Sequence, residues 1–213
     1  MVRRCSAIVA IVLLVLAPSP GGASDTGLSD IDGHPRSRFP LAIHIAPGGD
    51  TVLDAALSRA VSGWNVVARE ALGVEVFAPV LQQGAAQVVV RFVPSTRRGL
   101  MGETDVRASG GVISLPVRIE IVQPEARGQT SCETVLYQVF AHELGHALGL
   151  AHVRDPGSIM CCVAGSIDFN DPAARQAYVE ARRHPDVRSA SAQLKAHYAR
   201  AWATPGAEGR GVR

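Results

Sequence analysis

The stretch H-E-L-G-H-A-L-G-L-A-H, residues 142–152, decides how the rest of the chain is interpreted. His142 and His146 are four residues apart, so on a helix they lie on one face, one turn from each other. Two imidazoles held in this way can bind one metal ion, with the carboxyl group of Glu143 beside them. The run therefore predicts a helix that carries two metal ligands.

His152 can join the other two histidines only if the helix ends before it. At about 1.5 Å of rise per residue, a continuous helix would place His152 roughly 15 Å from His142, whereas a zinc–nitrogen bond is about 2.1 Å. Gly149 lies where the chain must turn, and glycine adopts the left-handed conformation that ends helices without a Cβ clash. We therefore expect the helix to end near Gly149 and the three rings to meet at one ion.

The pattern H-E-x-x-H-x-x-G-x-x-H resembles the zinc signature of the metzincin metalloendopeptidases. Ser158-Ile159-Met160 follows closely, and Met160 matches the methionine-containing turn of that family. The detail is most similar to the matrixin branch, in a bacterial-type minimal form. The resemblance implies an α+β fold, a metzincin-like zincin domain, in which a small twisted mixed β-sheet accompanies an active-site helix, a backing helix and C-terminal helices.

The same resemblance implies a peptidase mechanism. One catalytic zinc would be held by His142, His146 and His152, and Glu143 would act as general base in the hydrolysis of peptide bonds. Met160 would support the zinc site without binding the ion. The expected partner is a protein or peptide substrate.

The chain also departs from its family at informative positions. Val153 follows the third histidine, where matrixins commonly have serine, and Cys162 stands where two other metzincin branches have tyrosine. No loop rich in histidine and aspartate indicates a second, structural zinc, so we expect one zinc. Ca²⁺ is possible, but no aspartate-rich loop supports it.

Other interpretations of the histidine run stay open. A closed structural zinc site is usually four-coordinate and rich in cysteine, whereas three histidines leave a position for water. A thiolate of Cys161 or Cys162 could fill that position and close the site. The alternative function is therefore a secreted, zinc-stabilised binding protein without turnover.

The N-terminus suggests export. Residues 1–23 resemble a secretory signal peptide, with Arg3 and Arg4 before an apolar run and a Pro- and Gly-rich cleavage region after it. The apolar run is shorter than the roughly 20 residues that span a bilayer, although an uncleaved anchor is an alternative. We expect a secreted or periplasmic protein that is not associated with a membrane after signal cleavage.

The remaining chain is expected to form one domain. Residues 24–38 are polar and predict a flexible N-terminal segment, in which a carboxylate or His34 could cover the zinc until the segment is cut away. Residues 39–203 form the predicted catalytic domain and residues 204–213 a loose tail. The 213 residues are 47% hydrophobic with a net charge of +2, enough for one core and without a basic tract for nucleic acid. We expect a monomer.

Three cysteines remain once the signal is removed, namely Cys132, Cys161 and Cys162. An odd number in an exported chain means one bridge and a free thiol, or pairing between molecules. We favour a bridge from Cys132 to Cys161 or Cys162, and a bridge between the two neighbours is the strained alternative.

Hydrophobic periodicity predicts the elements around the zinc helix. Strands are expected at 41–45, 74–80, 87–93, 112–115 and 117–122, and helices at about 51–72, 172–183 and 187–202. Thr130-Ser131-Cys132-Glu133 has the capping-box pattern that would begin the zinc helix, and residues 96–111 are expected to form a loop. Because Pro116 favours an edge strand, we predict the substrate rim at Gly111, Val112, Ile113, Ser114 and Leu115.

Overall fold

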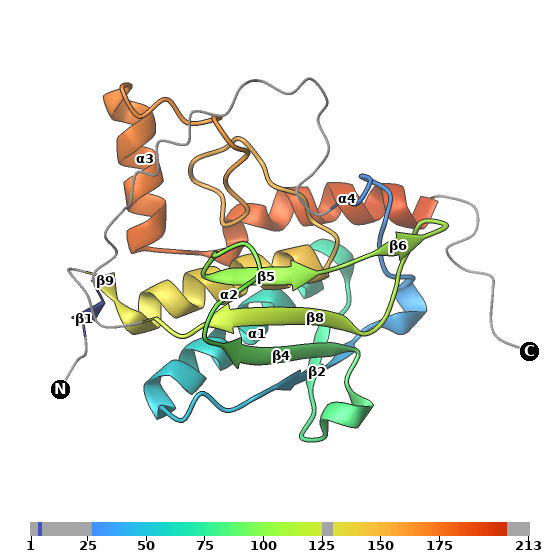
Figure 1. Ribbon diagram of the computed structural model, residues 1–213. Coiled ribbons are helices and arrows are strands. Elements are labelled where there is room, and N and C mark those ends of the chain that lie inside the picture. Colours follow the sequence, from blue (N-terminus) through green and yellow to red (C-terminus); the bar gives the residue numbers. More distant parts are fainter. Residues whose placement is uncertain (1–3, 6–26, 125–129, 204–213) are drawn as a thin grey trace, which may run out of the picture.

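The computed structural model describes residues 4–5, 27–124 and 130–203, and it places a mixed sheet in front of two long helices (Figure 1). The five strands lie in the order β3-β2-β4-β8-β5. The first four strands are parallel, and β5 runs antiparallel at the edge. Their bounds are Leu41–Ile45 (β2), Phe77–Pro79 (β3), Val88–Val93 (β4), Gly102–Asp105 (β5) and Val117–Val122 (β8). The expected α+β class with a small mixed sheet is confirmed.

Helix α1 (Thr51–Leu72) backs the zinc-bearing helix and follows the predicted bounds. The side chain of Asp50 accepts hydrogen bonds from the first turn, and Gly73 ends the helix with a φ of 72°. Its apolar stripe is buried, including Trp64, whose Nε1 donates to the carbonyl of Ala141 at 2.9 Å. This bond joins α1 to the turn of α2 just before the first histidine.

Helix α2 (Cys132–Ala147) carries the metal-binding run and ends as its glycine predicted. Ser131 caps its start by accepting from the backbone of Thr134, so the cap lies one residue later than the expected pattern. Gly149 has a φ of 90°, and the amide of Leu150 donates back to the carbonyl of Gly145 at 3.0 Å. The chain therefore reverses immediately after the helix.

The C-terminal part adds two helices above this pair (Figure 1). Helix α3 (Pro172–Arg183) has the predicted bounds and is capped by the side chain of Asp171. Helix α4 (Ser191–Ala203) follows the 3₁₀ helix η3 (Val187–Ala190). Two further 3₁₀ helices are η1 (Arg36–Arg38) and η2 (Gln83–Ala85). Two small ribbons complete the described chain, β6 (Ala108–Ser109) with β7 (Val112–Ile113) and β1 (Arg4–Cys5) with β9 (Thr130–Ser131).

The expected loop at 96–111 is wrong, because it contains β5 and β6. The sequence of β5 is Gly-Glu-Thr-Asp, which has little intrinsic preference for a strand. The strand forms because its backbone pairs with β8, Thr104 lying opposite Ile119. A tertiary contact thus creates an element that the local sequence does not indicate.

The expected flexible segment at 24–38 also needs correction from residue 28 onward. Gly33 forms a backbone bridge to Val112, and His34 is only 1% exposed. The His34 ring bonds to the carbonyl of Ala147 at the end of α2, 3.0 Å away, so it braces the zinc helix and does not cover the zinc. Residues 28–38, which we call the strap, therefore lie against β7 and the end of α2.

The expected signal peptide (1–23, except Arg4 and Cys5) and the expected tail (204–213) lie outside the described residues. Among the residues that the structure does describe, no helix is long and apolar enough to cross a membrane.

Candidate active site

The three predicted ligands meet at one point. His142 and His146 come from α2, and His152 returns to them after the turn at Gly149. The Nε2 atom of His142 lies 2.9 Å from that of His152 and 3.0 Å from that of His146, and the third pair is 3.2 Å apart. Of the described residues, only this trio groups three possible ligand atoms closely enough for one metal ion.

Backbone carbonyls orient two of the rings. His142 Nδ1 lies 2.8 Å from the carbonyl oxygen of Ile159, and His146 Nδ1 lies 2.7 Å from that of Leu150. A carbonyl only accepts hydrogen bonds, so in both rings Nδ1 carries the proton and Nε2 presents its lone pair. Two lone pairs 3.0 Å apart cannot bond to each other. Two such lone pairs repel each other, and a cation bound between the two Nε2 atoms would remove this repulsion.

Burial keeps these imidazoles neutral, as ligation requires. It lowers the pKa of His142 to about 4, against the raising effect of the Ile159 carbonyl. It also holds the pKa of His146 well below its usual range, and the neighbouring rings of His142 and His152 add to the effect. The rings are therefore ready to bind a metal near neutral pH.

The spacing fits zinc. A tetrahedral ion with bonds of about 2.0–2.1 Å places its nitrogen ligands roughly 3.3 Å from one another, close to the separations of 2.9 to 3.2 Å seen here. Three nitrogen ligands without a cysteine are the donor set of catalytic zinc sites, which keep a coordination position open.

Glu143 lies in the same pocket and is 6% exposed. Its Oε2 accepts a hydrogen bond from Thr104 Oγ1 on β5 at 2.6 Å. Burial raises the pKa of Glu143 to about 7, the Thr104 hydrogen bond opposes this rise, and the Glu103 carboxylate adds to it. A carboxyl group with such a pKa can both take up and release a proton near neutrality.

The Met160 turn supports the site from below. The Met160 side chain is fully buried against Gly145, between the two histidines of α2. The amide of Val153 donates to the carbonyl of Met160 at 3.1 Å, which ties the segment after His152 to the turn. Together with the Ile159 carbonyl on His142, these contacts let one turn fix two of the ligands.

A comparison with protein families agrees with this geometry. The matrixin family model matches residues 39–172, more than half of the chain. The chain belongs to the matrixin family. Matrixins are zinc metalloendopeptidases, so membership supports a metalloprotease, and the histidine trio is the zinc-binding site that the family leads us to expect. No curated protein gives a significant match.

The cysteines of this matrixin pair differently from the favoured prediction. The sulfurs of Cys161 and Cys162 are bonded to each other, and Cys132 is disulfide-bonded but pairs with neither of them. The prediction of a bridge from Cys132 to the Met160 turn is therefore wrong, because the turn stays beside the ligands while Cys132 begins the far end of α2. With both sulfurs in a bridge, neither is a free thiolate that could close the zinc site.

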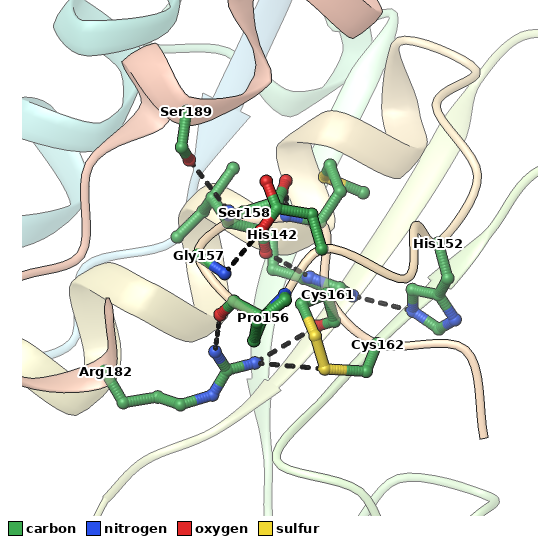
Figure 2. Close-up of a disulfide and its surroundings, with 12 residues drawn as sticks. His142, His152, Pro156, Gly157, Ser158, Cys161, Cys162, Arg182 and Ser189 are labelled. Carbon is green, nitrogen blue, oxygen red and sulfur yellow. Dashed lines mark hydrogen bonds between the residues drawn. A yellow bond between two sulfur atoms is a disulfide. The ribbon is translucent and has the colours of Figure 1, made fainter. Parts of the chain in front are cut away.

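Arg182 of α3 holds the bridge in place. Figure 2 shows its guanidinium beside the two cysteines, where it donates to the carbonyls of Pro156 and Cys161, each at 3.3 Å. One of its nitrogens lies 3.9 Å from Cys162 Sγ, and the guanidinium stacks on the ring of Tyr178 at 3.7 Å. Helix α3 thus fastens the loop that follows Met160.

The open side of the pocket is formed by β5 and the loop before it, not by the predicted rim. Its lining outside the histidines and Glu143 consists of Arg97, Arg98, Leu100 and residues 102–106. Residues 111–115 instead lie at the β6–β7 ribbon, where Ile113 is buried and its carbonyl accepts from Arg38. The predicted rim residues therefore do not line this pocket. The strand that carries Thr104 had no apolar pattern by which sequence analysis could find it.

Proposed function

We propose that the chain is an exported zinc metalloendopeptidase that hydrolyses peptide bonds with Glu143 as general base. The observation that carries the proposal is the meeting of three histidine Nε2 atoms in a pocket shared with a buried carboxyl group. Export is supported by the apolar, arginine-led N-terminus. All three proposed zinc ligands lie in one chain, so a monomer would be sufficient for the proposed activity.

The residues of the chain divide the work of the reaction. His142, His146 and His152 would hold the zinc, which when bound lowers the pKa of water to about 7 and polarises a carbonyl group. Glu143 takes the proton of the attacking water and then passes it to the leaving nitrogen of the substrate. The low exposure of Glu143 keeps bulk water from competing for that proton.

An extended peptide is the substrate that the pocket fits. Among the described residues β5 pairs only with β8 and forms the edge of the sheet, so its outer side can take up one more strand. A peptide on that edge would run past the histidine trio, with one carbonyl near Glu143. Proteins and peptides are therefore the proposed partners, and unfolded chains should be preferred because they can supply such a strand.

The test is cleavage of denatured casein by zinc-loaded protein that lacks residues 1–23. We expect activity in the wild type and a loss of at least about a thousandfold in Glu143→Ala at equal zinc content. Glu133→Ala is a matched control, because Glu133 lies at the far end of α2 and pairs with Arg59 on the surface. If none of the three proteins cleaves casein at full zinc occupancy, the proposal is overturned and a binding protein is favoured.

A further inference from the structure

The edge strand β5 does more than border the pocket, because its side chains contact the carboxylate of Glu143. Thr104 Oγ1 lies 2.6 Å from Glu143 Oε2 and 3.1 Å from the main-chain carbonyl oxygen of the same residue. A hydroxyl group has one hydrogen to donate, and the shorter contact to a carboxylate is the stronger bond. Thr104 therefore fixes the orientation of the carboxylate.

Gly102 contacts the same side chain two residues earlier in the strand. Residues two apart point to the same face of a strand, so Gly102 and Thr104 both face α2. A Cβ at Gly102 would lie 2.8 Å from both Cγ and Oε1 of Glu143, and 2.7 Å from Val139. Gly102 thus leaves space for the Glu143 side chain and Thr104 donates a hydrogen bond to it, and together they favour one rotamer of Glu143.

We propose that Thr104 is a positioning residue for the peptidase reaction, holding Oε2 of Glu143 so that Oε1 faces the attacking water. Within the described residues, Thr104 is the only group that donates to this carboxylate. The inference rests on the proposed function. It adds that the strand on which the substrate docks also aligns the general base.

The two edges of β5 hold Thr104 differently, because one edge is paired with β8 and the other lies at the edge of the sheet. Thr104 is paired with Ile119 of β8, a fully buried residue of the sheet. The opposite edge of β5 is the one that a substrate strand would cover. Docking of a peptide would therefore restrain Thr104 from both sides and with it the carboxylate.

A purely structural role for Thr104 is the rival explanation, since its hydroxyl also joins the sheet to α2. The two roles differ in what a shape-preserving substitution changes. A structural role predicts lower thermal stability or zinc content, with activity falling in proportion. A positioning role predicts a lower kcat while KM, zinc content and melting temperature stay near those of the wild type.

The experiment compares Thr104→Val and Thr104→Ser with the wild type on a quenched fluorescent peptide derived from a casein cleavage site. We expect Thr104→Val to lower kcat by about tenfold or more, with KM within about twofold, because a hydrogen bond to a charged group is lost. Thr104→Ser keeps the hydroxyl and should recover kcat to within about threefold of the wild type.

Thr134→Val is the matched control, because its hydroxyl bonds to Ser131 at the opposite end of the same helix. It should lower the melting temperature without changing kcat. A wild-type kcat in Thr104→Val, or a loss that follows zinc content, would overturn the inference while the peptidase proposal stands. An inactive, zinc-loaded wild type would overturn both.

Discussion

The sulfur of Met160 lies directly against Gly145, so that a Cβ atom at Gly145 would overlap Sδ and approach Trp64 to 3.2 Å. The absence of a side chain on one turn of α2 is therefore what lets the methionine turn rise close beneath the histidines. Trp64 completes the contact from α1, so the three elements around the site meet at this glycine.

This contact predicts the effect of Gly145→Ala. The added methyl group must displace Met160 or tilt α2, and overpacking of this kind costs about 1–3 kcal/mol. We expect a lower free energy of unfolding in urea and weaker zinc binding in a chelator competition. Gly84→Ala is the control, because a Cβ there would meet no atom within 4 Å. Equal zinc affinity and stability in both variants would contradict the account.

The strap at residues 28–38 predicts a pH dependence of stability. Burial lowers the pKa of His34 from 6.5 to about 4, the Ala147 carbonyl opposes this, and the charges of Arg38 and His197 add to it. Between these two pH values the unfolded chain binds a proton that the folded chain excludes. The contribution of His34 is therefore complete above about pH 6.5 and is lost as the pH falls toward about 4, by up to about 3 kcal/mol.

The measurement compares urea unfolding of the wild type and His34→Gln from about pH 7 to about pH 4.5. Glutamine can still donate to the Ala147 carbonyl but does not titrate, so its stability should fall less steeply with acid. Release of zinc at low pH affects both proteins and cancels in the difference. If the free energies of unfolding of the two proteins change with pH in parallel, His34 does not take up a proton on unfolding as expected.

The cysteine pairing predicts a simple chemical result. Digestion of unreduced, alkylated protein should give one peptide that contains both Cys161 and Cys162 and carries no alkyl group. Reduction followed by a second alkylation should add two alkyl groups to this peptide. Arg182→Ala removes the donors beside the bridge and should raise the rate of its reduction by a dithiol. A peptide cross-linked between Cys132 and either neighbour would contradict the structure.

Sequence patterns located the elements whose signals are local. Helix α1 was predicted within its bounds because Asp50 and Gly73 cap a continuous apolar stripe, and β2 because prolines and glycines flank an alternating run. The histidine trio was equally accessible, since helix geometry and Gly149 allow only one way for His152 to reach His142. The Met160 turn is indicated by the resemblance to the metzincins, whose methionine-containing turn lies downstream of the third histidine.

The parts that sequence patterns missed depend on distant partners. Strand β5 exists through its ladder with β8, so neither its position nor the role of Thr104 could be derived from Gly-Glu-Thr-Asp alone. The strap at 28–38 is polar in composition, yet His34 is buried because it can satisfy the free carbonyl at the end of α2. The choice between the cysteine pairings depends on the path of the loop around Met160, which is held by Arg182 from the distant helix α3.

X-ray absorption at the zinc edge tests the central claim most directly, because it reports the atoms bound to the ion in solution. We expect a first shell of three imidazole nitrogens and one oxygen at about 2.0–2.1 Å, and the loss of one imidazole in His152→Ala. A sulfur neighbour at about 2.3 Å, or a shell unchanged by His152→Ala, would contradict a zinc ion held by three histidines with a place open for water.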